Sequence, residues 1–283
     1  MVKRNKKGFE HFEERIQNEL LSHTIINNNK YCQWFERTPL KSQEVRHFTQ
    51  QFSVFSNLFL VAQLYKMINA VDLQEMRAAK EILANEIGCI FKPKHSESDE
   101  SKQQRQLNPE DEGDPGLVNT EGTIDGGTFR FRAAHFEWLL NFAKPLGLTF
   151  QDLGKREHGT KSTLFFCDEL IRIYGSHDFV QAAGASFAVE NWAAAGFWKQ
   201  LITGLKEFKS QQVPNLPLAF FTWHDKVEAQ HKEHTHDELK DLYFSDYPFD
   251  EDQFIAAGIE MLDGVGVFWD GLNQDRLAVN GRD

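Results

Sequence analysis

The residues with the clearest capacity for chemistry lie in one stretch, where His224, Glu228 and His231 are spaced four and three residues apart. An α-helix turns by about 100° per residue, so Glu228 and His231 lie at about +40° and −20° from His224. Because an aromatic run at residues 220–223 comes directly before, we expect this shared stripe to continue a buried face. Polar groups buried without partners are costly, and a metal ion bound by imidazole and carboxylate would offset that cost.

A solvated polar helix explains the same stretch without any chemistry. Polar and charged side chains continue just beyond it, at His231, Glu233, His234, His236, Asp237 and Glu238. This helix alone therefore leaves open whether the stripe binds a metal or is a solvated polar face. The choice depends on which polar side chains the other helices direct into the core.

Two further carboxylates lie on apolar faces of predicted helices. Glu86 follows Leu83 by three residues, near the end of a helical pattern that begins at Asp72. Glu190 lies in the Ala- and Gly-rich middle of a helix predicted over residues 178–205. An unpaired buried carboxylate shifts its pKa or is neutralised, so each of these groups needs a partner inside the protein.

His135 is the candidate on a fourth helix, predicted over residues 129–143, where it shares a face with Phe131 and Trp138. A single histidine at such a position is more often a structural core residue than a ligand. Four helices that direct carboxylates and imidazoles inward, however, form the pattern of a carboxylate-bridged dimetal site in a bundle core. Such donors suit Fe or Mn better than Zn.

Helical periodicity accounts for almost all of the apolar pattern, and strand signals are nearly absent. The other predicted helices cover residues 9–22, 42–70, 72–87, 163–174 and 249–269, beside the one that carries His224. The 42–70 pattern is apolar over more than half of its circumference, as expected at the centre of a bundle. The sequence thus predicts one all-α domain over residues 1–283, a bundle of about seven or eight helices.

Composition changes sharply between about residues 92 and 127, where Ser, Glu, Asp, Gln, Gly and Pro dominate. Such a segment cannot bury enough apolar surface to offset its ordering entropy. We therefore expect a disordered insertion, which either acts as a lid over the site or is simply tolerated.

Charge and composition exclude several classes of partner. The formal net charge of −11 disfavours nucleic acid and anionic membrane surfaces. No apolar run reaches the ~18 residues of a spanning helix, and the N-terminus lacks the apolar core of a signal peptide, so we expect a cytoplasmic location. The three cysteines are widely spaced, which predicts reduced thiols.

The candidate segments resemble, in order, the four ligand segments of the heme-oxygenase-like diiron oxidases and oxygenases. They are residues 83–88, residues 135–140, residues 182–190 and the His224-x-x-x-Glu228-x-x-His231 motif, and the resemblance covers roughly residues 20–270. It implies a heme-oxygenase-like bundle that binds two irons, with O2 as co-substrate for N-oxygenation of amines, oxidative C–C cleavage or self-processing. The ligands it implies are Glu86, His135, Glu190, His224, Glu228 and His231.

Two positions depart from the family pattern. Glu228 stands where the family commonly has Asp, which lengthens the ligand by one methylene. Gln51 stands where a glutamate is expected on the first long core helix, and a neutral amide is a weaker ligand than a carboxylate. One of the two irons is therefore expected to bind loosely.

Three functions remain open from the sequence. The first is an O2-activating diiron enzyme acting on a small apolar or amphipathic molecule, with Mn as the alternative metal and a homodimer as a candidate assembly. The second is a metal-free relative, such as a thiaminase-II-like hydrolase or a cofactor-ring oxidase, in which Cys167 or Cys89 would have to act as nucleophile. The third is a non-catalytic bundle that binds a metal or a partner.

Overall fold

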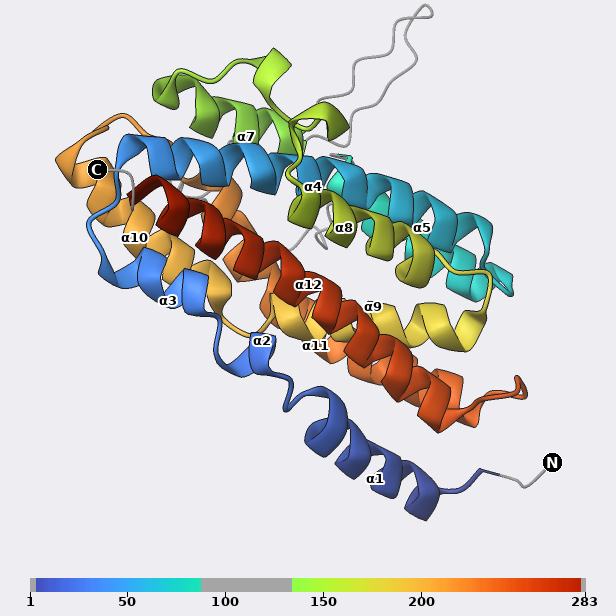
Figure 1. Cartoon of the computed structure of the whole chain (residues 1–283). Helices are drawn as coiled ribbons and strands as arrows, with labels where there is room; N and C mark the ends of the chain where they lie inside the picture. Colours follow the sequence, from blue (N-terminus) through green and yellow to red (C-terminus); the bar gives the residue numbers. More distant parts are fainter. Residues whose placement is uncertain (1–3, 88–133, 281–283) are drawn as a thin grey trace, which may run out of the picture.

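The computed structural model describes residues 4–87 and 134–280, except for the side chains at positions 81, 85, 134, 227–235 and 279–280. Every regular element in these ranges is a helix, which confirms the all-α class (Figure 1). The α-helices are α1 (Lys6–Arg15), α2 (Thr24–Asn27), α3 (Lys30–Arg37), α4 (Ser42–Ile68), α5 (Leu73–Glu86), α7 (Ala134–Ala143), α8 (Lys161–Glu169), α9 (Phe179–Ala193), α10 (Phe197–Gln211), α11 (Ala219–Phe244) and α12 (Glu251–Asn280). Short π-helical or 3-10 turns are η1 (Ile16–Leu20), η2 (Lys144–Leu146), η3 (Phe150–Asp152), η4 (Arg156–His158) and η5 (Leu170–Tyr174).

The described helices outnumber the seven or eight predicted, because two short helices were not predicted and one predicted helix is divided. The helices α2 and α3 follow the predicted segment 9–22, in a region expected to begin with a turn. The helix predicted over residues 178–205 ends at Ala193 and restarts at Phe197. Gly196 between them has φ of 96°, a left-handed conformation that glycine adopts readily and that interrupts a right-handed helix.

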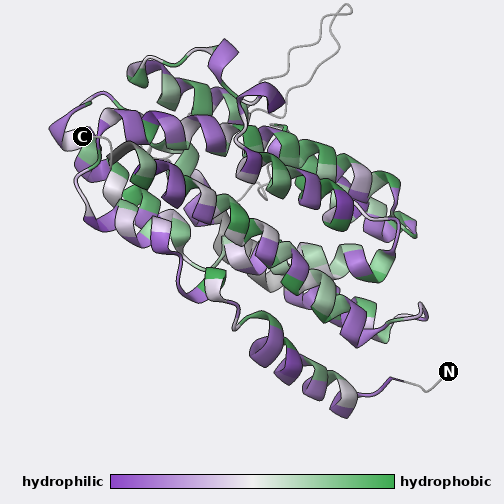
Figure 2. Ribbon diagram, viewed as in Figure 1, coloured by the Kyte–Doolittle hydropathy of each residue, from purple (hydrophilic) through white to green (hydrophobic). Residues whose placement is uncertain are grey.

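The long helix α4 is buried along much of its length, as its apolar circumference predicts. Its Phe48 and Phe52 are almost completely shielded from solvent and belong to one continuous group of buried apolar residues that extends from Phe9 to Leu272. By contrast, α1 is mainly hydrophilic (Figure 2), and its two buried residues, Phe9 and Phe12, pack against Tyr243 of α11. The core thus lies between the long helices and is covered by α1 at one edge.

Close helix contacts depend on small residues at defined positions. A Cβ atom on Gly184 of α9 would lie 2.2 Å from the carbonyl oxygen of Phe254 in α12. This confirms that the Ala- and Gly-rich middle of α9 permits a close neighbour, and Gly204 of α10 makes the same kind of approach to Phe35 of α3. The short distance between α9 and α12 at Gly184 therefore fixes the position of α9 against α12.

The predicted insertion at about residues 92–127 lies outside the described residues, as does Cys89. In the part of the chain that the structure describes, no helix combines the length and apolarity needed to cross a lipid bilayer.

Candidate metal centre

Three of the predicted ligands converge from three separate helices. Glu86 is the last residue of α5, His135 lies in the first turn of α7, and His224 lies in the first turns of α11. One donor atom from each lies within 4.8 Å of the other two. His135 and His224 are only 4% and 9% exposed, so the donors meet inside the protein.

Glu86 and His135 are in direct contact within this cluster. Oε2 of Glu86 lies 3.1 Å from Nδ1 of His135. This distance allows a hydrogen bond from Nδ1–H to the carboxylate, in which Glu86 orients the imidazole and leaves Nε2 as the atom that can bind a metal.

Nε2 of His135 is shielded from solvent and has no hydrogen-bond partner among the described residues. The ring is enclosed by Trp138, Trp223 and the imidazole of His224. A buried ring nitrogen without a partner is costly, and a metal ion is one way to satisfy it. This observation fits a bound metal better than a purely structural histidine.

His224 is held in a defined orientation by its own helix. Nδ1 donates a hydrogen bond of 2.5 Å to the carbonyl oxygen of Phe220, one turn earlier. The imidazole also stacks on the Trp198 ring, at 4.8 Å between centroids and an interplanar angle of 20°. With the proton on Nδ1, the tautomer places an electron pair on Nε2, as metal coordination requires.

Glu190 lies beside these ligands without belonging to the three-residue cluster. It lines a cavity of ≈ 70 Å³ together with Glu86 and His224, and it is 9% exposed. The cavity walls are mainly aromatic, formed by Phe52, Phe55, Phe59, Trp192, Phe197, Trp198 and Phe220. The site therefore combines two carboxylates and an imidazole with an apolar chamber.

Two indole groups that sequence reasoning missed also belong to this chamber. Nε1 of Trp192 and Nε1 of Trp198 are buried and have no acceptor among the described residues. Each indole N–H is a hydrogen-bond donor beside this chamber, and no described acceptor satisfies it. The helical pattern counts tryptophan as an apolar residue, so the sequence contained no indication that these N–H groups lie beside a cavity.

Glu228 and His231 complete the predicted ligand set on α11. Their backbone belongs to this single continuous helix, but their side chains lie outside the described residues. Their part in the site therefore stays a prediction.

Gln51, the doubtful ligand candidate on α4, does not line this cavity. Its Oε1 accepts hydrogen bonds from the backbone N–H of Thr160 and from Oγ1 of Thr163, each at 2.8 Å, and its Nε2 donates to the carbonyl oxygen of His158 at 2.9 Å. The amide therefore holds the segment before α8 against α4.

The side of α4 that faces the cavity carries Phe52, Phe55, Ser56 and Phe59. The one acidic residue of α4 is Glu44, which accepts a hydrogen bond from the backbone N–H of Lys41 at the start of the helix. α4 thus brings no carboxylate to this site.

Cys167, a nucleophile considered for the metal-free alternative, is 1% exposed. Burial, the main cause, raises the pKa of its thiol to about 12. A reactive cysteine has a lowered pKa and partial exposure, so the environment of Cys167 is that of a structural thiol.

No known protein family matches this chain, and no curated protein is recognisably similar to it in sequence. The assignment of a function therefore depends on the site itself.

Proposed function

We propose that this protein is a non-heme iron oxidase or oxygenase with a heme-oxygenase-like bundle, which uses O2 to oxidise a small apolar or amphipathic organic molecule. The observation that carries the proposal is the convergence of Glu86, His135 and His224 from three helices in a buried position. Two histidines and one carboxylate with positions left open are typical of non-heme Fe(II) oxygenases.

The donor set suits iron, with manganese as the alternative metal. Glu86, His135 and His224 would hold one ion, and Glu190 with Glu228 and His231 would hold a second. Because α4 contributes no carboxylate, we propose that the second ion is the more labile of the two. Bound iron would supply the one-electron chemistry that allows O2 to react with an organic molecule.

The other side chains of the cavity would bind and orient the substrate. The aromatic walls exclude water and favour an apolar body, since each ring buries a large apolar surface. The N–H groups of Trp192 and Trp198 would bind an oxygen or nitrogen atom of the substrate. Glu190, which lines the same cavity, would accept a proton or bind metal.

A non-catalytic metal-binding bundle is the second candidate, favoured by the missing carboxylate on α4. The two functions differ in one property, since only the enzyme consumes O2 when loaded with reduced iron.

Metal analysis of protein produced in iron-supplemented medium, followed by an O2-consumption assay, tests both functions. We expect retained iron in the unmodified chain, a loss of most of it in Glu86→Gln and His224→Ala, and no loss in His177→Ala, which changes an exposed histidine. Iron without O2 consumption under any reductant would leave only the binding function. A chain that retains no iron after loading would contradict both.

A further inference from the structure

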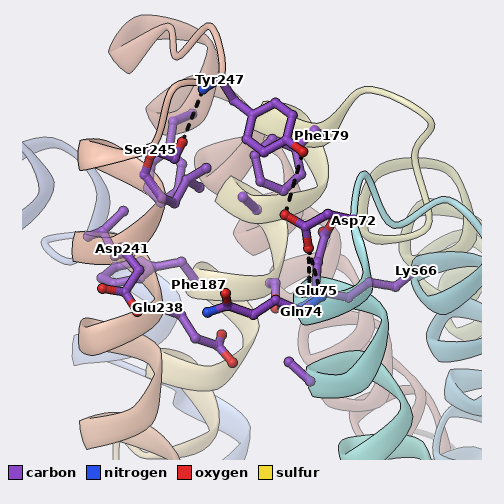
Figure 3. A pocket seen from close by; sticks show the side chains of 16 residues that line it. Lys66, Asp72, Gln74, Glu75, Phe179, Phe187, Glu238, Asp241, Ser245 and Tyr247 are labelled. Atoms are coloured by element: carbon purple, nitrogen blue, oxygen red, sulfur yellow. Dashed lines mark hydrogen bonds between the residues drawn. The ribbon is translucent and has the colours of Figure 1, made fainter. Parts of the chain in front are cut away.

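A second and larger cavity lies at the other end of the same helices. Its volume is ≈ 210 Å³, and its walls come from the C-terminal end of α4, the first turns of α5, the N-terminal half of α9 and the last turns of α11 (Figure 3). Glu75 of α5 lines it, whereas Glu86, eleven residues later, lies at the metal centre. That separation is about 16 Å along a helix, so the two sites are distinct.

Lys66 is the charged group at the inner part of this cavity, and it is only 9% exposed. Its Nζ donates one hydrogen bond, of 2.6 Å, to Oγ of Ser186, and it lies 5.1 Å from the centre of the Tyr174 ring. No carboxylate of the described residues lies within 4.0 Å of it. Glu75 of the same lining interacts electrostatically with Lys66 from beyond that distance. An ammonium group has three N–H donors and the hydrogen bond to Ser186 uses one, so Lys66 retains donors for an anionic acceptor.

The other charged residues of the lining are acidic. Asp72 and Glu75 come from the start of α5, and Glu238 and Asp241 come from the opposite wall on α11 (Figure 3). Four carboxylates against one lysine give the lining a formal charge of −3, which would repel a simple anion. A ligand that satisfies Lys66 must therefore also carry a positive charge.

The remaining wall is apolar and suits an aliphatic or aromatic body. It is formed by Phe179, Ala183, Phe187, Leu239, Leu242 and Phe254. The aromatic rings among them also attract a cation held over their faces.

We propose that this cavity binds a small zwitterion with an apolar side chain, of the chemical class of the apolar α-amino acids. Its carboxylate would bind Nζ of Lys66, its ammonium group would face the carboxylates of Glu238 and Asp241, and its side chain would pack against Phe179 and Phe187. This site is independent of the metal centre and of the function proposed for it.

Calorimetric titration with three related probes tests the proposal. L-phenylalanine carries both charges, 2-phenylethylamine lacks the carboxylate, and 3-phenylpropanoate lacks the ammonium group. We expect L-phenylalanine to bind at least about tenfold more tightly than either analogue, since each loses one charged hydrogen bond. L-leucine serves as an aliphatic probe of the same class.

Two variants assign the charges to residues. Lys66→Met should weaken the binding of L-phenylalanine by about tenfold and leave the binding of 2-phenylethylamine unchanged. Glu238→Gln combined with Asp241→Asn should weaken the binding of both probes. Lys80→Met, which changes an exposed lysine of α5, is the matched control. Equal binding of L-phenylalanine and 2-phenylethylamine to the unmodified protein would overturn the proposal, as would the absence of binding by both amino acids at millimolar concentration.

Discussion

Gln51 and Phe52 are neighbours in the sequence but have different roles, because successive side chains on a helix point about 100° apart. Phe52 lines the aromatic cavity, while Gln51 makes three hydrogen bonds with the segment from His158 to Thr163. The sequence analysis identified the part of α4 that passes the site. Which of its side chains faces the cavity depends on the rotation of the helix about its axis, which the sequence pattern did not define.

The hydrogen bonds of Gln51 give a prediction for Gln51→Ala. The variant removes the partners of the Thr160 N–H and the His158 carbonyl oxygen, so we expect a loss of about 1–3 kcal/mol in the free energy of unfolding. Urea denaturation measures this loss, with Gln17→Ala at an exposed position as the control. Iron content should stay unchanged, and a stable variant that loses iron would place Gln51 at the site after all.

Cys167 gives a prediction about reactivity. Since burial raises the pKa of its thiol to about 12, the thiolate is scarce at pH 8, and we expect Cys167 to resist iodoacetamide in the folded protein and to react after denaturation. Mass spectrometry of the digested protein measures the modification. Rapid modification of folded protein at Cys167 would show an activated thiol and would revive the metal-free alternative.

The same shift has a consequence for stability at high pH. The pKa of Cys167 is higher in the folded state than its ordinary value of 9.0. The contribution of the protonated thiol to the free energy of unfolding is therefore fully present below about pH 9 and is lost as the pH rises toward 12. Cys167→Ser at the same position should show a smaller loss of stability over this interval, as measured by urea denaturation at each pH.

At the scale of the helices, the close contact between α9 and α12 depends on Gly184. A methyl group there would lie 2.2 Å from a backbone oxygen of Phe254, which cannot move without shifting α12. We therefore expect Gly184→Ala to destabilise the protein by about 1–3 kcal/mol, despite the better helix propensity of alanine.

Gly266→Ala, within α12, is the matched control for this prediction. A Cβ atom on Gly266 would meet nothing within 4 Å, so we expect an unchanged or slightly higher melting temperature. Equal melting temperatures for the Gly184 and Gly266 variants would show that α9 and α12 are not in close contact.

The helices themselves were largely predictable, and their ends less so. α4 covers Ser42–Ile68, close to the predicted residues 42–70, because its apolar pattern is long and uninterrupted. The break at Gly196 was missed, since the Ala-rich sequence before it and the apolar spacing of Phe197 and Leu201 after it both support a helix, and only the backbone conformation shows the interruption. Helix propensity is a local property, whereas the break redirects α10 to pack on α3.

At the scale of the whole molecule, α4, α5, α9 and α11 form the walls of both cavities, one near each end. Glu86, His135 and His224 were predicted from inward position and from the family resemblance, and the structure brings them together. The second cavity was not predicted, because Lys66 and the acidic residues around it are separated by up to 175 positions in the chain. Their proximity depends on tertiary packing, which no local pattern encodes.

The central claim is that Glu86, His135 and His224 bind iron, and anomalous diffraction from crystals of iron-loaded protein tests it most directly. Data collected on both sides of the iron absorption edge identify the element as well as its position. We expect an iron peak within about 2.0–2.3 Å of donor atoms from all three residues. An iron peak elsewhere, or no peak in protein that has been loaded with iron, would contradict the account.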